Sequence, residues 1–166
     1  MLSLGAAAYY DLKEVGSFEV SFEELAGSSG DPDTLAWWAS QPKETWEACR
    51  RDPQPVKLGM QRFGDWVNDL AARHGADPVC VAYPSGFDFL FAYWYFVSGG
   101  ISSPFGFSCL DIQSYAAGLL RIPFKKSKKK QYPKEWLEGL PELNHKAVDD
   151  ARAQGLMFLN MLKHNA

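Results

Sequence analysis

A histidine and an aspartate five residues apart, His145 and Asp150, are the residues in this sequence best placed to do chemistry. They lie at the start of a segment whose apolar residues recur at helical spacing. A carboxylate in the first turns of a helix can hold a metal ion, and an imidazole just before the helix can accept a proton from water. The alternative is that His145 is a surface residue and that Asp149 and Asp150 only complement the helix dipole.

A second carboxylate, Asp88, follows a short apolar run at residues 78–83, which is typical of a central strand covered on both faces. Residues 90–97 are apolar and aromatic, and they predict a buried helix. Ligand sites of open α/β sheets form at the carboxyl ends of strands, where Asp88 is expected. An acid among aromatic rings is costly unless it is paired or liganded. The alternative role for Asp88 is that of a helix cap.

One dense run of positive charge precedes the histidine. Its five lysines could neutralise phosphates of a nucleic-acid backbone, and they are Lys125, Lys126, Lys128, Lys129 and Lys130. A solvated loop is the alternative. Adjacent tryptophans at Trp37 and Trp38 predict core or lid residues, and one of them could stack on a base if its ring face is exposed.

The composition predicts one globular domain spanning residues 1–166. The chain is 46% hydrophobic and 14% aromatic, which argues against a disordered chain, and its net charge of −3 provides no overall basic field for nucleic acid. Three cysteines without a C-x-x-C spacing argue against a zinc site or a disulfide framework and favour a reducing compartment, the cytoplasm. No signal peptide or membrane span is predicted, so no membrane partner is expected.

The elements that must position these residues begin with a hairpin. Residues 2–10 predict a buried strand in which Gly5 permits close backbone approach, residues 11–16 a turn, and residues 17–22 a half-exposed strand. A short helix over residues 35–38, capped by Asp33 or Thr34, and another over residues 43–50 follow. The clearest helix covers residues 56–74, and Gly75 is placed to end it.

The second half of the chain predicts a short strand at residues 105–109 and a helix over residues 112–120 with Asp111 as its cap. A short helix covers residues 134–140. Asn144 is expected to cap the last helix, because its side-chain oxygen can accept from the free amides of the first turn. The face expected to be buried comprises Ala147, Ala151, Phe158 and Leu162.

Two of these stretches resemble the motifs of a known family. The pattern H-x-A-x-x-D followed by A-R-A-Q, which begins at His145, resembles the third motif of the DEDDh 3′-5′ exonucleases, and S-G-F-D-F-x-F around Asp88 resembles the second. The segments T-L-A-W-W, F-G-D-W-V and C-L-D-I-Q-S-Y-A extend the likeness to the short exoribonucleases of bacteria and phages. The resemblance covers essentially the whole chain, with the motifs in the family's order.

The resemblance implies an α/β protein of the ribonuclease H-like fold, with a mixed central sheet and helices on both faces. It implies hydrolysis of terminal phosphodiesters of single-stranded nucleic acid from the 3′ end, releasing nucleoside monophosphates, with RNA slightly favoured over DNA. Asp88 and Asp150 would be metal ligands for two Mg²⁺ or Mn²⁺ ions, and His145 the general base. Carboxylate oxygens suit such hard cations. A homodimer is a candidate assembly, because several relatives are dimers.

The chain departs from the family pattern at its beginning. The first motif, D-x-E, belongs on a strand that would precede residues 2–10, and Asp11, Glu14 and Glu19 do not match its position. We therefore expect either a sequence that begins late, which we favour, or a protein that lacks this first strand and half its metal ligands. The competing functions are a catalytically impaired relative that binds nucleic acid or a protein partner through the lysine run, and an α/β domain with an accidental match.

Overall fold

A β-hairpin forms the centre of the computed structural model, which describes residues 1–141 and 144–164. β1 (Ser3–Tyr10) pairs antiparallel with β2 (Lys13–Ser21), with Leu4 opposite Val20. Asp11 and Leu12 have φ of 49° and 61°, as a two-residue hairpin turn requires. The turn is therefore shorter than the expected residues 11–16, and β2 begins at Lys13.

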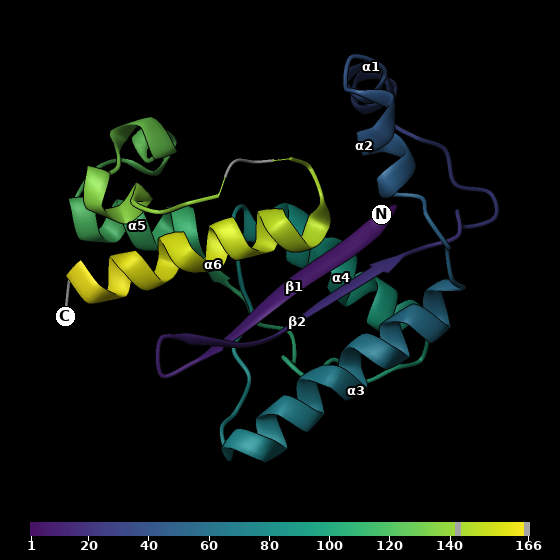
Figure 1. Ribbon diagram of the computed structural model, residues 1–166, viewed down its shortest axis with the longest axis horizontal. Helices are drawn as coiled ribbons and strands as arrows, with labels where there is room; N and C mark the ends of the chain where they lie inside the picture. The colour runs from purple at the N-terminus through teal and green to yellow at the C-terminus, as the bar shows by residue number, and fades with distance from the viewer. Residues whose placement is uncertain (142–143, 165–166) are drawn as a thin grey trace.

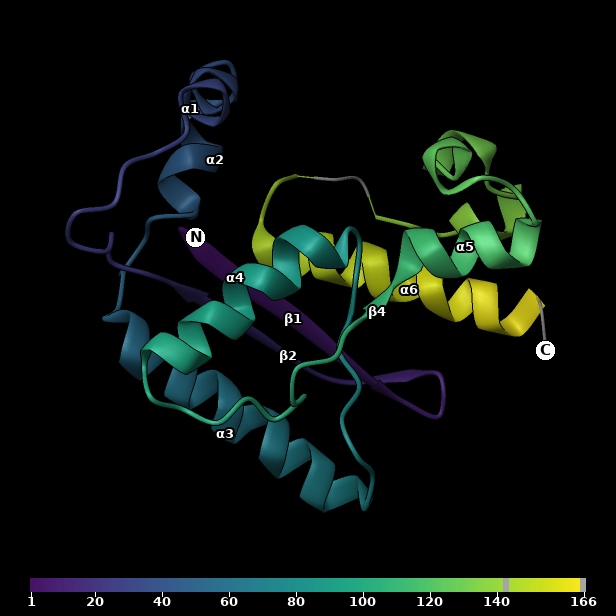
Figure 2. The same ribbon diagram turned by 180° about the vertical axis from the view of Figure 1, so that it is seen from behind.

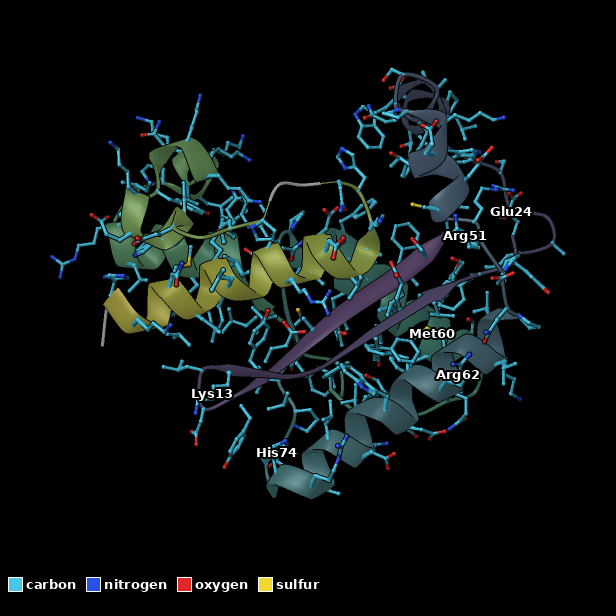
Figure 3. The ribbon with its side chains drawn as sticks, in the orientation of Figure 1. Lys13, Glu24, Arg51, Met60, Arg62 and His74 are labelled. Carbon is cyan, nitrogen blue, oxygen red and sulfur yellow. The ribbon has the colours of Figure 1, made fainter. Side chains whose placement is uncertain are left out.

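One face of the hairpin is covered by two helices, α3 (Val56–His74) and α4 (Ser85–Ser98) (Figure 2). The bounds predicted for α3 are confirmed, and Gly75 ends it in the left-handed conformation with φ of 59°. Figure 3 shows the Met60 side chain between α3 and the hairpin, where it is fully buried. The core on this face comprises Leu4, Val20, Phe22, Met60, Phe63, Val67, Tyr95 and Phe96.

The opposite face of the hairpin is covered by the last helix, α6 (Ala147–His164) (Figure 1). Side chains alternate between the two faces of a strand, so the small residues Ser3, Gly5 and Ala7 lie on the face of β1 opposite to Leu4. Gly5 lies so close to the backbone of Ala147 and Val148 that a Cβ at this position would overlap it. The close backbone approach predicted for Gly5 is confirmed, and it fixes where α6 begins on the sheet.

A second sheet consists of two short parallel strands, β3 (Val81–Ala82) and β4 (Leu110–Asp111). The strand predicted over residues 78–83 thus shrinks to two residues bracketed by prolines, which cannot donate ladder hydrogen bonds. The strand expected at residues 105–109 is wrong, because pairing begins at Leu110. Within the described residues the strands form two separate two-stranded sheets, whereas one mixed sheet was expected. The α/β class, with helices on both faces of the hairpin, is confirmed.

The second half of the chain builds its own core against the carboxyl half of α6. α5 (Ile112–Leu120) has its predicted bounds, and three single-turn helices follow it at Phe124–Lys126, Lys129–Gln131 and Lys134–Leu137. The last of these is shorter than the helix predicted over residues 134–140. The core on this side comprises Ile112, Ala116, Tyr132, Trp136, Met157 and Met161.

The buried side of α6 differs from the predicted one. The four residues expected to be buried are only half-buried. The buried positions are instead Ala153, Met157, Leu159, Asn160 and Met161. The reason is that α6 packs against the hairpin with its first half and against the α5 region with its second, so no single stripe describes its contacts. Even Asn160 is buried, because its amide donates to the backbone oxygens of Trp136 and Glu138.

An arm of two short helices, α1 (Pro32–Ala39) and α2 (Lys43–Ala48), lies beyond the end of the hairpin (Figure 1). Asp31 caps α1, since its Oδ1 accepts from the Thr34 amide at 2.8 Å, so the expected caps Asp33 and Thr34 are wrong. Among the helices that the structure describes, none is long and apolar enough to cross a membrane.

Candidate catalytic site

His145 lies on a tight turn just before α6, as the sequence predicts. Its φ of 59° is left-handed, and the first helical hydrogen bond runs from the Asp150 amide to the Lys146 oxygen at 3.0 Å. Asn144 lies upstream of the helix, where its Oδ1 accepts from the Lys146 amide at 2.9 Å. An N-cap must lie next to the first helical residue, and Asn144 lies further upstream, so its expected role as N-cap is wrong. Asn144 instead stabilises the turn that presents His145.

Asp88 and Asp150 come together from the first turns of two different helices. α4 has Pro84 as its N-cap and no side-chain capping bond, so the alternative in which Asp88 caps this helix is wrong. Burial raises the pKa of Asp88, and the charge of Asp150 raises it further. Burial likewise raises the pKa of Asp150. The structure thus places two carboxylates, 62 positions apart in sequence, within electrostatic reach of each other.

One oxygen of this pair has no partner in the protein. Asp150 Oδ1 is buried and makes no hydrogen bond. A buried carboxylate oxygen left unpaired is costly, and such oxygens commonly mark the place where an ion or a water binds. Across residues 1–141 and 144–164, no group of three or more His, Cys, Asp or Glu side chains is gathered for a metal ion. The described residues therefore fit a cation held by two carboxylates and otherwise by solvent or substrate oxygens.

Gln154 links both acidic segments, although sequence reasoning gave it no role. It lies one helical turn after Asp150, and its Oε1 accepts from the Tyr83 amide at 2.9 Å, at the end of β3. Its side chain also hydrogen-bonds to Asp88, which partly offsets the effect of burial on the pKa of that carboxyl. The four-residue spacing from Asp150 was the available signal, since residues at i and i+4 share a helix face.

The structure separates the five lysines of the basic run. Lys129 is half-buried, with its Nζ 5.1 Å from the centroid of the Tyr83 ring, whereas the other four are exposed. Burial lowers the pKa of Lys129, and its charge in turn lowers the pKa of Asp150. The run thus contributes one inward cation to the carboxylate pair and four outward cations to the surface beside it.

The helical arm borders the site on its other side. The Trp37 and His145 rings are 5.1 Å apart between centroids and nearly perpendicular, at 89°. The Cys49 thiol donates to the His145 backbone oxygen at 3.4 Å. Trp37 is 43% exposed, so part of its ring remains open to a ligand. Sequence reasoning did not foresee these contacts, because the arm and His145 are about a hundred positions apart.

Two neighbouring acids have structural partners instead. Asp149 accepts from the Asn144 amide nitrogen at 2.7 Å and from Arg152 at 3.4 Å, and these hydrogen bonds lower its pKa. Asp111 caps α5 through the Ser114 amide at 2.6 Å, which confirms its predicted role, and it also accepts from the Ser85 amide at 3.0 Å. The arrangement leaves Asp88, Asp150, Lys129 and His145 as the groups able to bind a cation, hold an anion and move a proton.

Comparison with known proteins supports a nuclease. Residues 6–162 match the family described as the 3′-5′ exoribonuclease Rv2179c-like domain. A comparison with curated proteins finds no match. The family match spans nearly all of the chain and includes every residue of the site described above. The chain belongs to the Rv2179c-like 3′-5′ exoribonuclease domain family.

Proposed function

We propose that this protein is a metal-dependent 3′-5′ exoribonuclease of the DEDDh type that acts on single-stranded RNA and releases nucleoside monophosphates. The observation that carries the proposal is the buried, unpartnered Asp150 Oδ1 beside Asp88. Two carboxylates whose pKa values are raised by burial are expensive to ionise at neutral pH without a cation between them. A protein with no use for a cation would gain stability by replacing one of them.

Asp88 and Asp150 are the residues that would hold Mg²⁺ or Mn²⁺. Both ions prefer oxygen ligands, and one or two carboxylates together with waters and substrate phosphates are their usual surroundings in enzymes. When bound, such an ion stabilises the charge that develops on phosphodiester oxygens during hydrolysis. Gln154 orients Asp88 and fixes the Tyr83 backbone, so the two acidic segments keep their relative position before any ion arrives.

His145 acts as the general base in this proposal. An imidazole nitrogen can accept a proton from the attacking water and release it again. The left-handed turn and the perpendicular contact with the Trp37 ring position the imidazole at the mouth of α6, one turn from Asp150. His145 therefore has a fixed position from which it can serve a water bound near the carboxylates.

The substrate would enter between the lysine run and the helical arm. In this proposal the half-buried Lys129 binds a phosphate beside the carboxylates, and the four exposed lysines contact the RNA backbone further along. The exposed part of Trp37 is available to stack on the terminal base, which alanine scanning in other systems values at about 1–3 kcal/mol per base. Trp37→Ala should then raise KM for short RNA by roughly 5- to 100-fold with little change in kcat.

The decisive experiment follows a 5′-labelled single-stranded RNA, and its DNA counterpart, with Mg²⁺ or Mn²⁺ and with EDTA. We expect metal-dependent stepwise shortening from the 3′ end that is lost in Asp150→Asn and kept in Asp149→Asn. Asp149→Asn is the matched control, because it removes one charge from the adjacent position of the same helix. Shortening that survives equally in both variants, or that proceeds in EDTA, would contradict the proposal.

One observation favours a second function, a catalytically impaired relative that binds nucleic acid or a protein partner. The described residues gather two carboxylates and not three or more. Under this alternative, a labelled RNA would still bind, binding would weaken when the exposed lysines are neutralised, and no shortening would occur with either metal.

The three cysteines are unpaired thiols. A reducing compartment such as the cytoplasm would keep them in this state under both functions.

A further inference from the structure

Two cysteines that the sequence separates are neighbours in the second sheet. Cys80 and Cys109 immediately precede β3 and β4, where Val81 is the parallel partner of Leu110. The Leu110 amide donates to the Cys80 oxygen at 2.8 Å, so the strands are already paired at the cysteines. The two thiols form a hydrogen bond with a sulfur–sulfur distance of 3.5 Å. Backbones of neighbouring strands lie about 4.8 Å apart, which is within the range that a disulfide spans.

We propose that Cys80 and Cys109 form a redox-active pair that a two-electron oxidant of the peroxide class converts into an intramolecular disulfide. The pair adjoins the site described above, since the charge of Asp88 raises the pKa of both thiols, but it has no part in the proposed hydrolysis. Its role is that of a modification site, and its reactivity is independent of whether the chain degrades RNA.

The surroundings give the pair both access and a division of roles. Both cysteines are half-buried and neither is fully enclosed, so an oxidant can reach the pair from solvent. The hydrogen bond with Cys80 lowers the pKa of Cys109, whereas the same bond and burial raise the pKa of Cys80. Cys109 is therefore the thiol that ionises first and attacks the oxidant, and Cys80 remains the protonated neighbour that completes the reaction.

The chemistry balances with one peroxide. The Cys109 thiolate attacks one peroxide oxygen, the O–O bond breaks, hydroxide leaves, and Cys109 becomes a sulfenic acid. The Cys80 sulfur then attacks the Cys109 sulfur and displaces its oxygen, which leaves as water with the Cys80 proton. The two sulfurs lose two electrons in total, and the two peroxide oxygens gain them and leave as water. A thiol reductant such as dithiothreitol reverses the bond by exchange.

The third cysteine provides an internal control. Cys49 is buried at the end of α2 and donates to the His145 oxygen, so it has neither a sulfur neighbour nor ready access to an oxidant. A disulfide between Cys80 and Cys109 would close a loop that contains α4. Closing a loop of this length restricts the unfolded chain, so the oxidised protein should melt roughly 5–10 °C higher than the reduced one.

The test treats the whole folded chain with a slight excess of hydrogen peroxide, removes the oxidant, and counts thiols before peptide mapping. We expect two of the three thiols to disappear, a Cys80–Cys109 peptide to carry the link, Cys49 to remain alkylatable, and dithiothreitol to restore all three. Cys49→Ser should behave as the parent protein does. Cys109→Ser should form no intramolecular disulfide, and Cys109→Ala serves in its place if the serine variant does not fold.

A second measurement separates the fold from simple thiol reactivity. In urea, where the strands are unpaired, the same oxidation should yield mixed linkages that include Cys49. A Cys80–Cys109 link that forms no faster in the folded protein than in urea would overturn the proposal. So would oxidation of Cys49 ahead of the pair, or linkage only between separate molecules.

Discussion

Two adjacent aspartates in the first turn of α6, Asp149 and Asp150, have opposite surroundings. Asp149 lies on a solvated side, where Asn144 and Arg152 bond its carboxylate and lower its pKa. Asp150 lies on the side that faces Asp88 and Lys129, where burial raises its pKa and one oxygen has no partner. We call these the paired side and the open side of α6.

The difference between the sides separates structure from function. On the paired side, Arg152 also bonds Glu14 at 3.0 Å and Ser17 at 2.9 Å, so the helix is tied to β2 by groups that satisfy one another. On the open side, two carboxylates are brought together, and the charge of Lys129 compensates them only in part, because burial still raises the pKa of both acids. Folding alone does not require such an arrangement, and a bound cation would relieve it. The open side is therefore where a ligand has something to contribute.

The largest effect should come from neutralising the open side. Asp150→Asn should lower exonuclease activity by at least about 100-fold, because a catalytic cation contributes several kcal/mol and each tenfold in rate corresponds to about 1.4 kcal/mol. Asp149→Asn should stay within about twofold of the parent. Rates of 3′ shortening of a labelled RNA measure both variants. Equal losses in the two would mean that the distinction between the sides has no catalytic meaning.

The lysine run allows the same comparison with positive charge. Lys129→Met should reduce activity by roughly 10- to 100-fold, since a hydrogen bond to a charged group contributes about 1.5–3 kcal/mol. Lys130→Met should weaken RNA binding only slightly and mainly at low salt, because that lysine is exposed. Single-turnover rates and binding curves at two salt concentrations distinguish the variants. A Lys130 effect as large as the Lys129 effect would make the run a uniform surface patch.

The element boundaries at which Asp88 and Asp150 lie were predictable from local patterns, whereas their pairing across 62 positions was expected only from the resemblance to the exonuclease motifs. An apolar run followed by an aromatic helix places Asp88 at the end of a strand, and the helical spacing after Asp150 places that residue at a helix start. α3 was predicted to the residue for a similar reason, since one strong stripe and a terminal glycine define it. Local patterns suffice where one neighbour decides the packing.

The burial of Lys129 could not be predicted, because the sequence of the lysine run does not show which of its five side chains faces the protein interior. The contact between Trp37 and His145 depends on where the arm docks, and no short-range pattern encodes that position. The buried side of α6 was predicted wrongly because two cores share the helix. In each case the deciding contact joins segments that are distant in sequence.

The pH dependence of stability should reveal the open side in the metal-free protein. Burial holds the folded pKa of Asp150 above its ordinary 3.8, so folding favours the protonated acid. The resulting stabilisation is complete below about pH 3.8 and is lost as the pH rises through the raised value. The amide in Asp150→Asn does not ionise, so this variant does not lose stability in this way as the pH rises. Its Tm in EDTA, compared with that of the parent, should be higher by roughly 1–3 °C at pH 7 and no higher at pH 3.5.

Manganese provides the control for this measurement. A ligand that binds only the folded state stabilises it, so Mn²⁺ should raise the Tm of the parent at pH 7 and leave Asp150→Asn nearly unchanged. Asp149→Asn should respond to Mn²⁺ as the parent does. If Mn²⁺ raised the Tm of all three proteins equally, the ion would be binding elsewhere.

The smallest effect should come from the paired side. Arg152→Met removes the bonds to Glu14, Ser17 and Asp149, yet these groups are exposed or half-exposed, and ion pairs open to solvent contribute little. We expect Tm to fall by no more than about 2 °C, the difference to shrink in 1 M NaCl because salt screens exposed charges, and RNA shortening to proceed at the parental rate. A large loss of activity in Arg152→Met would show that the paired side positions α6 for catalysis, and the two sides would then have to be treated as one site.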